Sequence, residues 1–352
     1  YGRVVRGETW TALQYWFFYA YNDWRTGFNG ANDHEADWEQ IVVYVYGGPD
    51  GTAIPGWVAY AQHDYHGADL RRRWDHADEL ELVGDHPVVN VGAGSHASYF
   101  RAGEYLAEQE LKMPPLLRTG INTFSRLLNG HANDADARIL PVAFVDFARG
   151  DGLQIGPGCE RGWAAVVLDE SQPWAGAYRG LWGISVEDPF EGEDAPAGPM
   201  FNRDGTVRSS WSDPIGFAAL HAVPPPTRER ELLEMRAAAV RLRQEELARS
   251  IAELELQTAE IGAEGGPASG RASSRDDGVD ALRTQLAEQY AERADGVLRL
   301  STIQQRLERQ AAGIVEAPDA HIRRMAVPDP PGNARFGRAL ELWAAVSIGL
   351  LL

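Results

Sequence analysis

The last third of the chain contains two consecutive stripes of apolar residues. These stripes restrict the fold of that region more than any other sequence feature. The first recurs every seven residues and contains Leu233, Val240, Leu247, Leu254 and Ile261. A spacing of seven lines one side of an α-helix, and a second helix can cover that side. The second stripe contains Leu286, Tyr290, Val297, Leu300, Leu307, Ala311 and Ile314. The pattern predicts an antiparallel helical hairpin over 224–316, a coiled-coil-like arm for packing or homo-oligomerisation.

Aromatic residues divide the chain at the stretch HAVPPPTRER, residues 221–230. After Pro224 only Tyr290, Phe336 and Trp343 remain. Before it, short aromatic or β-branched runs are separated by Gly, Pro, Asp and Asn, which is typical of strands. These runs cover 11–21, 38–46, 56–63, 79–83, 86–94, 139–148 and 162–169. Their spacing predicts a mainly β protein, with an antiparallel β-sandwich over 1–223 and irregular loops.

Three further stretches differ in composition from the strand-like runs. Residues 104–137 have the composition of one or two helices, and residues 184–222 resemble a long ordered loop. Residues 317–352 read as a linker followed by the apolar segment ALELWAAVSIGLLL. A membrane span needs about 20 apolar residues, so this segment is either a core helix or the first half of a span. Arginines precede it, and for a span they would place the preceding chain on the cytoplasmic side of a membrane.

The formal net charge of −18 limits the partners of the protein. It argues against nucleic acid and against simple attraction to phosphate or anionic lipid. An acidic protein can still reach an anion through a bound cation. The single cysteine, Cys159, excludes an internal disulfide.

The stretch NDHEADWEQIVVYV, residues 32–45, concentrates acidic residues at the start of an aliphatic run. In a strand, Asp37 and Glu39 share one face with Ile41, while Trp38 faces the other way. His34 lies three residues before Asp37, close enough in sequence to converge with both carboxylates. Two carboxylates this close repel each other unless a cation lies between them. The donor types suit Ca²⁺ or Mg²⁺, and also Mn²⁺; the alternative is that these charges only solvate a sheet edge.

The longer stretch LQYWFFYAYNDWRTGFNGANDHEADWEQIVVYV resembles the centre of the necrosis-and-ethylene-inducing-like proteins. There an aromatic strand ends in Asp, and a GHRHDWE heptapeptide leads into an aliphatic strand. The HEADWE form is more similar to the vacuolar-protein-sorting-62-related family, as are AYAQHDYHGADLRRRW (59–74) and HPVVNVGAGSHASYF (86–100). The resemblance implies a β-sandwich that recognises sphingolipid head groups through a divalent ion. It implies as metal ligands Asp23, His34, Asp37 and Glu39.

Several residues near this motif are candidates for supporting roles. Glu35 stands where the heptapeptide has Arg, and His63 and His96 each end a strand-like run. The two histidines are expected either to line the same pocket, in contact with the ligand or behind the metal ligands, or to support turns. The run RRR at 71–73 is either an anion clamp or a solvated charge run.

These observations favour a non-enzymatic module that recognises a polar head group or glycan in a divalent-metal-dependent way. The helical arm would present it near a membrane. One alternative is a metal-dependent hydrolase of phosphoester or glycan substrates, with Glu35 or His96 as the base. Another is an assembly scaffold in which a metal only stabilises a loop. No catalytic residue can be named from spacing.

Overall fold

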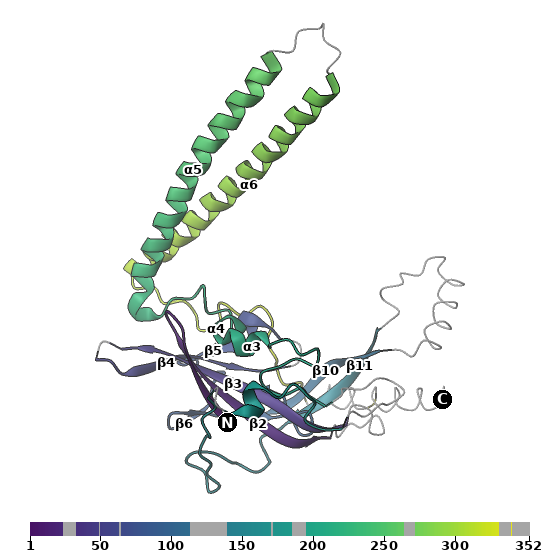
Figure 1. Cartoon of the computed structure of the whole chain (residues 1–352). Helices are drawn as coiled ribbons and strands as arrows, with labels where there is room; N and C mark the ends of the chain where they lie inside the picture. The colour runs from purple at the N-terminus through teal and green to yellow at the C-terminus, as the bar shows by residue number, and fades with distance from the viewer. Residues whose placement is uncertain are drawn as a thin grey trace. The chain divides into compact units, whose positions relative to one another are not determined.

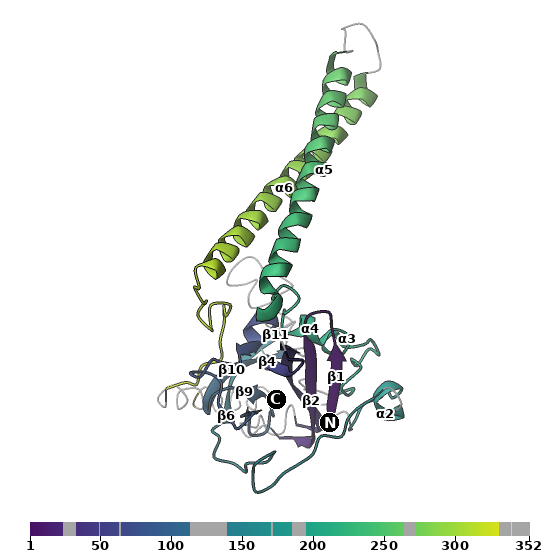
Figure 2. The same cartoon turned by 90° about the vertical axis from the view of Figure 1, so that its left-hand side faces the viewer.

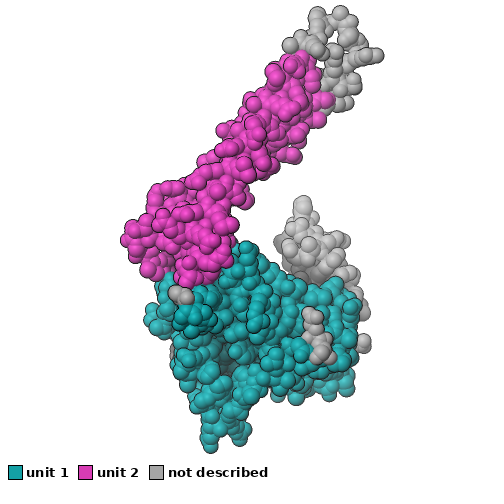
Figure 3. Space-filling model, turned by 60° about the vertical axis from the view of Figure 1, so that its left-hand side comes forward, with its two compact units in different colours: residues 1–223, 318–352 teal, residues 224–317 magenta. Residues whose placement is uncertain are grey.

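The computed structural model describes residues 1–23, 33–48, 50–62, 65–112, 139–169, 172–184, 195–263, 272–330 and 339. The chain divides into two compact units, coloured separately in Figure 3. Unit 1 is Tyr1–Val223 together with Pro318–Leu352, and unit 2 is Pro224–Ala317. No helix in the described part of the chain is long and apolar enough to cross a membrane. The apolar segment 339–352 lies outside the described residues except for Ala339.

Unit 1 is built on a five-stranded antiparallel sheet in which each strand pairs with the next along the chain (Figure 1). The strands are β1 (Gly2–Arg6), β2 (Thr11–Asn22), β3 (His34–Gly47), β4 (Ala53–Tyr60) and β5 (Arg71–Arg73). The two long central strands, β2 and β3, pair along almost their entire length. Together with the two long helices of unit 2, described below, this sheet confirms the predicted combination of antiparallel strands and two long helices.

Side chains cover both faces of this sheet. Alternate residues of β3 enter different clusters, because side chains of a strand point to opposite faces in turn. Val42 and Tyr44 pack with Trp10 on one face, and Ile41 and Val43 pack on the other. Burying both faces explains why residues 41–46 of β3 are aromatic or aliphatic at every position.

Short ladders complete unit 1. They are β6 (Leu82–Val83) with β7 (His86–Pro87), β8 (Asn90–Val91) with β9 (Ser98–Tyr99), and β10 (Gly103–Lys112) with β11 (Ile139–Ala148) (Figures 1 and 2). A sandwich needs a second large sheet facing the first, and in the described residues only these two-stranded ladders accompany it. Unit 1 also has short helical segments: η1 (Gly67–Leu70) comes before β5, and α2 (Pro173–Gly176), α3 (Ser209–Ser212) and α4 (Pro214–Phe217) follow β11.

The helix expected from residue 104 onward is wrong for the first part of that stretch. Gly103–Lys112 is strand β10, paired in register with β11. Its sequence, GEYLAEQELK, favours a helix by intrinsic propensity, but pairing with a β-branched and aromatic strand overrides that preference. The remainder, 113–137, lies outside the described residues.

Two of the three arginines at 71–73 are part of the core, where neither a solvated charge run nor an anion clamp describes them; Arg73 is partly exposed and pairs with Asp75. Arg71 and Arg72 are 4% and 1% exposed. The Arg71 guanidinium donates hydrogen bonds to the carbonyls of Ala218 and Ala219 and lies over the Trp57 ring. Arginine can be buried in this way because flat aromatic rings and backbone carbonyls replace its water.

The segment after the helical arm returns to unit 1. The His321 ring donates a hydrogen bond of 3.1 Å to the Arg71 carbonyl and packs edge-on against Trp57. Further along, the Asp329 carboxylate accepts the amide of Leu106 on β10. Arg71 therefore contacts the chain both before the arm, at Ala218, and after it, at His321.

Unit 2 is the predicted helical hairpin, formed after η3 (Pro226–Arg228) by α5 (Glu229–Ala263) and α6 (Ala272–Ala311). On α5, Leu233, Leu247 and Leu254 of the predicted stripe are buried, and so are Ala237 and Ile251 beside them, all at most 7% exposed. Ion pairs cross between the helices from Arg306 to Glu229 (2.7 Å) and from Arg243 to Glu292 (2.8 Å).

The predicted stripe on α6 is partly wrong. Tyr290 and Val297 are 45% and 56% exposed. The positions that turn towards α5 include Gln289, which bonds to Ser250, and Gly296, which is buried against Gln244. Because these seam positions hold polar and small residues, the apolar pattern did not show which face of α6 is buried.

Candidate functional site

The HEADWE motif forms the beginning of β3, opposite the end of β2. The register sets Glu39 opposite Phe17, Asp37 opposite Tyr19, and His34 opposite Asn22. Asp37 and Glu39 therefore lie on the same face as Ile41, as strand alternation predicts. Ala36 interrupts the regular strand with a backbone φ of +63°, in the left-handed region that residues with a Cβ seldom adopt.

Asp37 forms a hydrogen-bonded pair with His96. The distance from His96 Nδ1 to Asp37 Oδ2 is 2.9 Å, and Asn22 Nδ2 donates to the same oxygen at 3.1 Å. The His96 ring stacks on Tyr19 with ring centres 3.9 Å apart. Burial and the charges of Glu39 and Asp37 raise the pKa of the Tyr19 phenol, so it stays neutral. A carboxylate at Nδ1 favours the tautomer that leaves Nε2 as a proton or metal acceptor.

Buried Asp146 on β11 anchors the loop that carries His96. Its carboxylate accepts hydrogen bonds from the hydroxyls of Ser95 (2.6 Å) and Tyr99 (2.8 Å). His96 itself has a left-handed backbone, with φ +59°. Gly92 lies so close to the Asp146 carboxylate that a side chain there would collide with it. These contacts fix the loop and position His96 beside Asp37.

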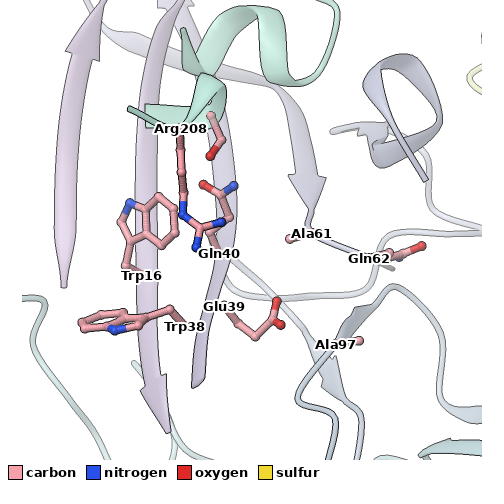
Figure 4. Close-up of a pocket in the computed structure, with 9 residues that line it drawn as sticks. Trp16, Trp38, Glu39, Gln40, Ala61, Gln62, Ala97 and Arg208 are labelled. Atoms are coloured by element: carbon pink, nitrogen blue, oxygen red, sulfur yellow. The ribbon is translucent and has the colours of Figure 1, made fainter. Parts of the chain in front are cut away.

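A pocket of about 190 Å³ adjoins this pair (Figure 4). Glu39 lines it from the face that carries Asp37, and Ala97, which follows His96, lines another side. The other lining residues combine two indole rings with polar side chains: Trp16, Trp38, Gln40, Ala61, Gln62, Arg208 and Ser210. The pocket therefore combines apolar walls with hydrogen-bond donors and acceptors.

Arg208 reaches the pocket from a segment far along the chain. Its Nε donates to the carbonyls of Gly198 and Phe201, both at 3.0 Å. Figure 4 shows its guanidinium next to the Gln40 side chain. Burial lowers the pKa of Arg208, the nearby charge of Arg203 lowers it further, and the carboxylate of Glu39 opposes both effects.

The structure places the predicted site residues in different surroundings. Asp23 is exposed at the end of β2. His34 is buried, and its Nδ1 lies 2.8 Å from the carbonyl of Ala36 on its own strand. The Glu35 carboxylate accepts the amide of Ile184 at 3.0 Å, which holds a neighbouring segment. His63 lies outside the described residues.

The described residues bring the four predicted metal ligands only partly together. Across the described ranges, no group of three or more His, Cys, Asp or Glu side chains could hold a metal ion. Of the four predicted ligands, Asp37 and Glu39 share a face, whereas His34 is directed to its own backbone. Asp37 pairs with His96, which was predicted to contact the ligand or to lie behind the metal ligands.

Several residues of the site carried no local signal. Tyr19 could have been placed opposite Asp37 from the strand alternation alone, once the two strands were paired. Arg208 and Asp146 could not, because each lies in a region that resembles a loop or an ordinary strand. Their roles follow from contacts with residues more than 45 positions away.

Comparison of the chain with protein-family models, curated proteins and solved structures finds no match. The features that indicate a function are the chemistry of the pocket and the Asp37–His96 pair.

Proposed function

We propose that unit 1 is a non-enzymatic recognition module for a polar head group or glycan, which binds in the pocket beside Asp37 and His96. The supporting observation is the composition of that pocket. Trp16 and Trp38 form part of its wall, with their rings packed against other aromatic side chains of the core. Glu39, Gln40 and Gln62 offer acceptors and donors for hydroxyl groups.

The size of the pocket sets the scale of the ligand. The pocket has a volume of about 190 Å³. This volume suits a single ring with its hydroxyl groups rather than a lipid chain. The rest of a larger glycan or lipid would lie outside the pocket.

Three finer expectations belong to the same proposal. The small ladders would complete a sandwich with the main sheet, and the helical arm would present the module near a membrane. A divalent cation would join the ligand at the carboxylates of Asp37 and Glu39. Recognition through the pocket side chains does not depend on this cation, so the cation is a separate prediction.

An array of glycans and lipid head groups, followed by titration calorimetry of the hits, tests the proposal. Glu39→Gln should weaken binding of a hit at least tenfold, whereas the exposed Glu81→Gln should leave it unchanged. Binding to no member of the array would contradict the recognition function. Repeating the titration with EDTA tests the cation alone: unchanged affinity would contradict the cation and leave the recognition proposal in place.

A second candidate, hydrolysis, is favoured by the Asp37–His96 pair. A carboxylate bonded to His96 Nδ1 is the arrangement that prepares Nε2 to accept a proton from water. Incubating the protein with phosphodiesters, phosphomonoesters and glycans decides between the two functions. Product formed by the wild type and absent with His96→Gln would make the protein a hydrolase.

A further inference from the structure

The geometry points to Arg208 as the receptor for an oxyanion, so that the ligand of the pocket carries one carboxylate or phosphate beside its hydroxyl groups. This inference rests on the proposed recognition function and names the charge of its ligand. An acidic sugar and an inositol phosphate share this chemistry, and the experiment below separates them.

The guanidinium of Arg208 is fixed in place but only partly used. Both hydrogen bonds to the Gly198 and Phe201 carbonyls come from Nε. These bonds orient the plane of the guanidinium at the pocket wall. Within the described residues, neither Nη1 nor Nη2 of Arg208 has a hydrogen-bond or ion-pair partner. Four N–H donors therefore remain for a ligand.

Such a cation needs a counter-charge. Arg208 is partly buried, and a buried charge is costly unless it is paired. Of the nine residues that line the pocket, only Glu39 carries an opposite charge, and it acts on Arg208 through its electrostatic field. The Nη groups can form two parallel bonds to a carboxylate or phosphate, which an isolated hydroxyl cannot match.

The remaining polar groups of the pocket indicate the chemistry of the rest of the ligand. Gln40, Gln62 and Ser210 bind neutral groups, and Glu39 accepts from hydroxyls while it repels a second anion. The net charge of −18 also repels anions in general. Binding of an anion would thus require a local cation, and it would be selective for a ligand with a single charge placed at Arg208.

Two pairs of ligands test this inference by calorimetry: glucuronate against glucose, and myo-inositol 1-phosphate against myo-inositol. We expect the wild type to bind at least one acid ten times or more tightly than its neutral partner. The preferred pair tells whether the anion is a carboxylate or a phosphate. Arg208→Gln should abolish the preference, and Arg208→Lys should retain part of it, since lysine keeps the charge but not the paired donors.

Arg203→Gln is the matched control, because it removes an exposed positive charge near Arg208 without touching the pocket. It should change the acid preference by less than about threefold, since solvent screens exposed charges. Neutral and acidic members binding equally well to the wild type would overturn the inference while leaving the recognition function intact. Failure of both acids to bind would also overturn it, whatever the array shows. The wild-type preference decides the question even where Arg208→Gln impairs folding.

Discussion

The two units bury their side chains in different ways. Unit 1 buries large aromatic residues that meet from distant parts of the chain, such as Trp10, Tyr44 and Tyr60, each at most 1% exposed. Unit 2 buries the aliphatic residues of one helix, α5, in a seam to which α6 contributes small and polar residues. Contacts of the first kind have large sequence separation, and those of the second follow from a repeat within each helix.

Polar residues show the same contrast. Unit 1 buries Gln14, Arg72 and Asp146, and each of them is hydrogen-bonded. In the arm, the charged pairs are at the surface or half-exposed, where each contributes at most about 1 kcal/mol. The buried polar contacts of unit 1 determine where side chains point, and a binding pocket depends on that precision. The arm needs only to remain a helix pair.

The largest effect expected from this contrast is that of Trp10→Ala. Trp10 is 1% exposed, donates to the carbonyl of Val223 and packs edge-on against Tyr46. Removing it should lower the free energy of unfolding of unit 1 by about 3–5 kcal/mol. In urea, the near-UV signal of the aromatic core should be lost early, while the far-UV helical signal of the arm persists.

Leu298→Ala is the control for that experiment. Leu298 is a helix residue of unit 2 and is 68% exposed. Its replacement should change stability by no more than about 0.5 kcal/mol. Loss of the helical signal together with the aromatic signal in Trp10→Ala would show that the two units unfold as one.

Two shortened chains sharpen the comparison at the next level. Ending the chain at Val223 removes both the arm and the segment 318–330, whose His321 and Asp329 bond to unit 1. Replacing 224–317 by a short Gly-Ser linker removes only the arm. At about 0.5–1.5 kcal/mol per hydrogen bond, the first chain should be about 1–3 kcal/mol less stable than the second. Equal melting temperatures would show that the returning segment contributes nothing to unit 1.

A smaller effect is expected from pH, and only in unit 1. Burial against Trp57 and Arg71 lowers the pKa of His321 from 6.5 to about 4. The folded state therefore prefers the neutral ring. The stabilising effect is complete above pH about 6.5 and is lost as the pH falls towards about 4.

Thermal melts between pH 7 and pH 4 measure this dependence. His321→Gln should be less stable than the wild type at pH 7, and the difference should shrink as the pH approaches 4. The exposed His86→Gln serves as the control and should follow the wild-type curve. A constant difference between His321→Gln and the wild type would contradict the assignment.

The smallest effect belongs to the arm. Gly296 on α6 faces the Gln244 amide, and a methyl group there would meet the flexible end of that side chain. Gln244 can move aside, so Gly296→Ala should gain up to about 1 kcal/mol of helix propensity. The midpoint of the helical transition in urea reports the change. A lower midpoint would show that the helices need glycine at this crossing.

Local periodicity was enough to predict much of this protein. The alternation of residues 38–46 predicted which side chains of β3 share a face, and the spacing of Leu233, Leu247 and Leu254 predicted the arm. Both succeed because a repeat of two or seven residues reports which side of an element is buried, and this depends only on the geometry of that element. The division at Pro224 had the same basis, since aromatic composition is also a property of short stretches.

Only the tertiary structure decided which distant groups meet. Residues 104–112 became a strand because β11 lies beside them, and Arg71 and Arg72 entered the core because aromatic rings and carbonyls cover them. His96 and Asp37 were both marked in the sequence, but their pairing depends on a loop fixed by Asp146. Whether a polar residue is buried, and what it bonds to, depends on partners brought together by folding, and no repeat along the chain encodes those partners.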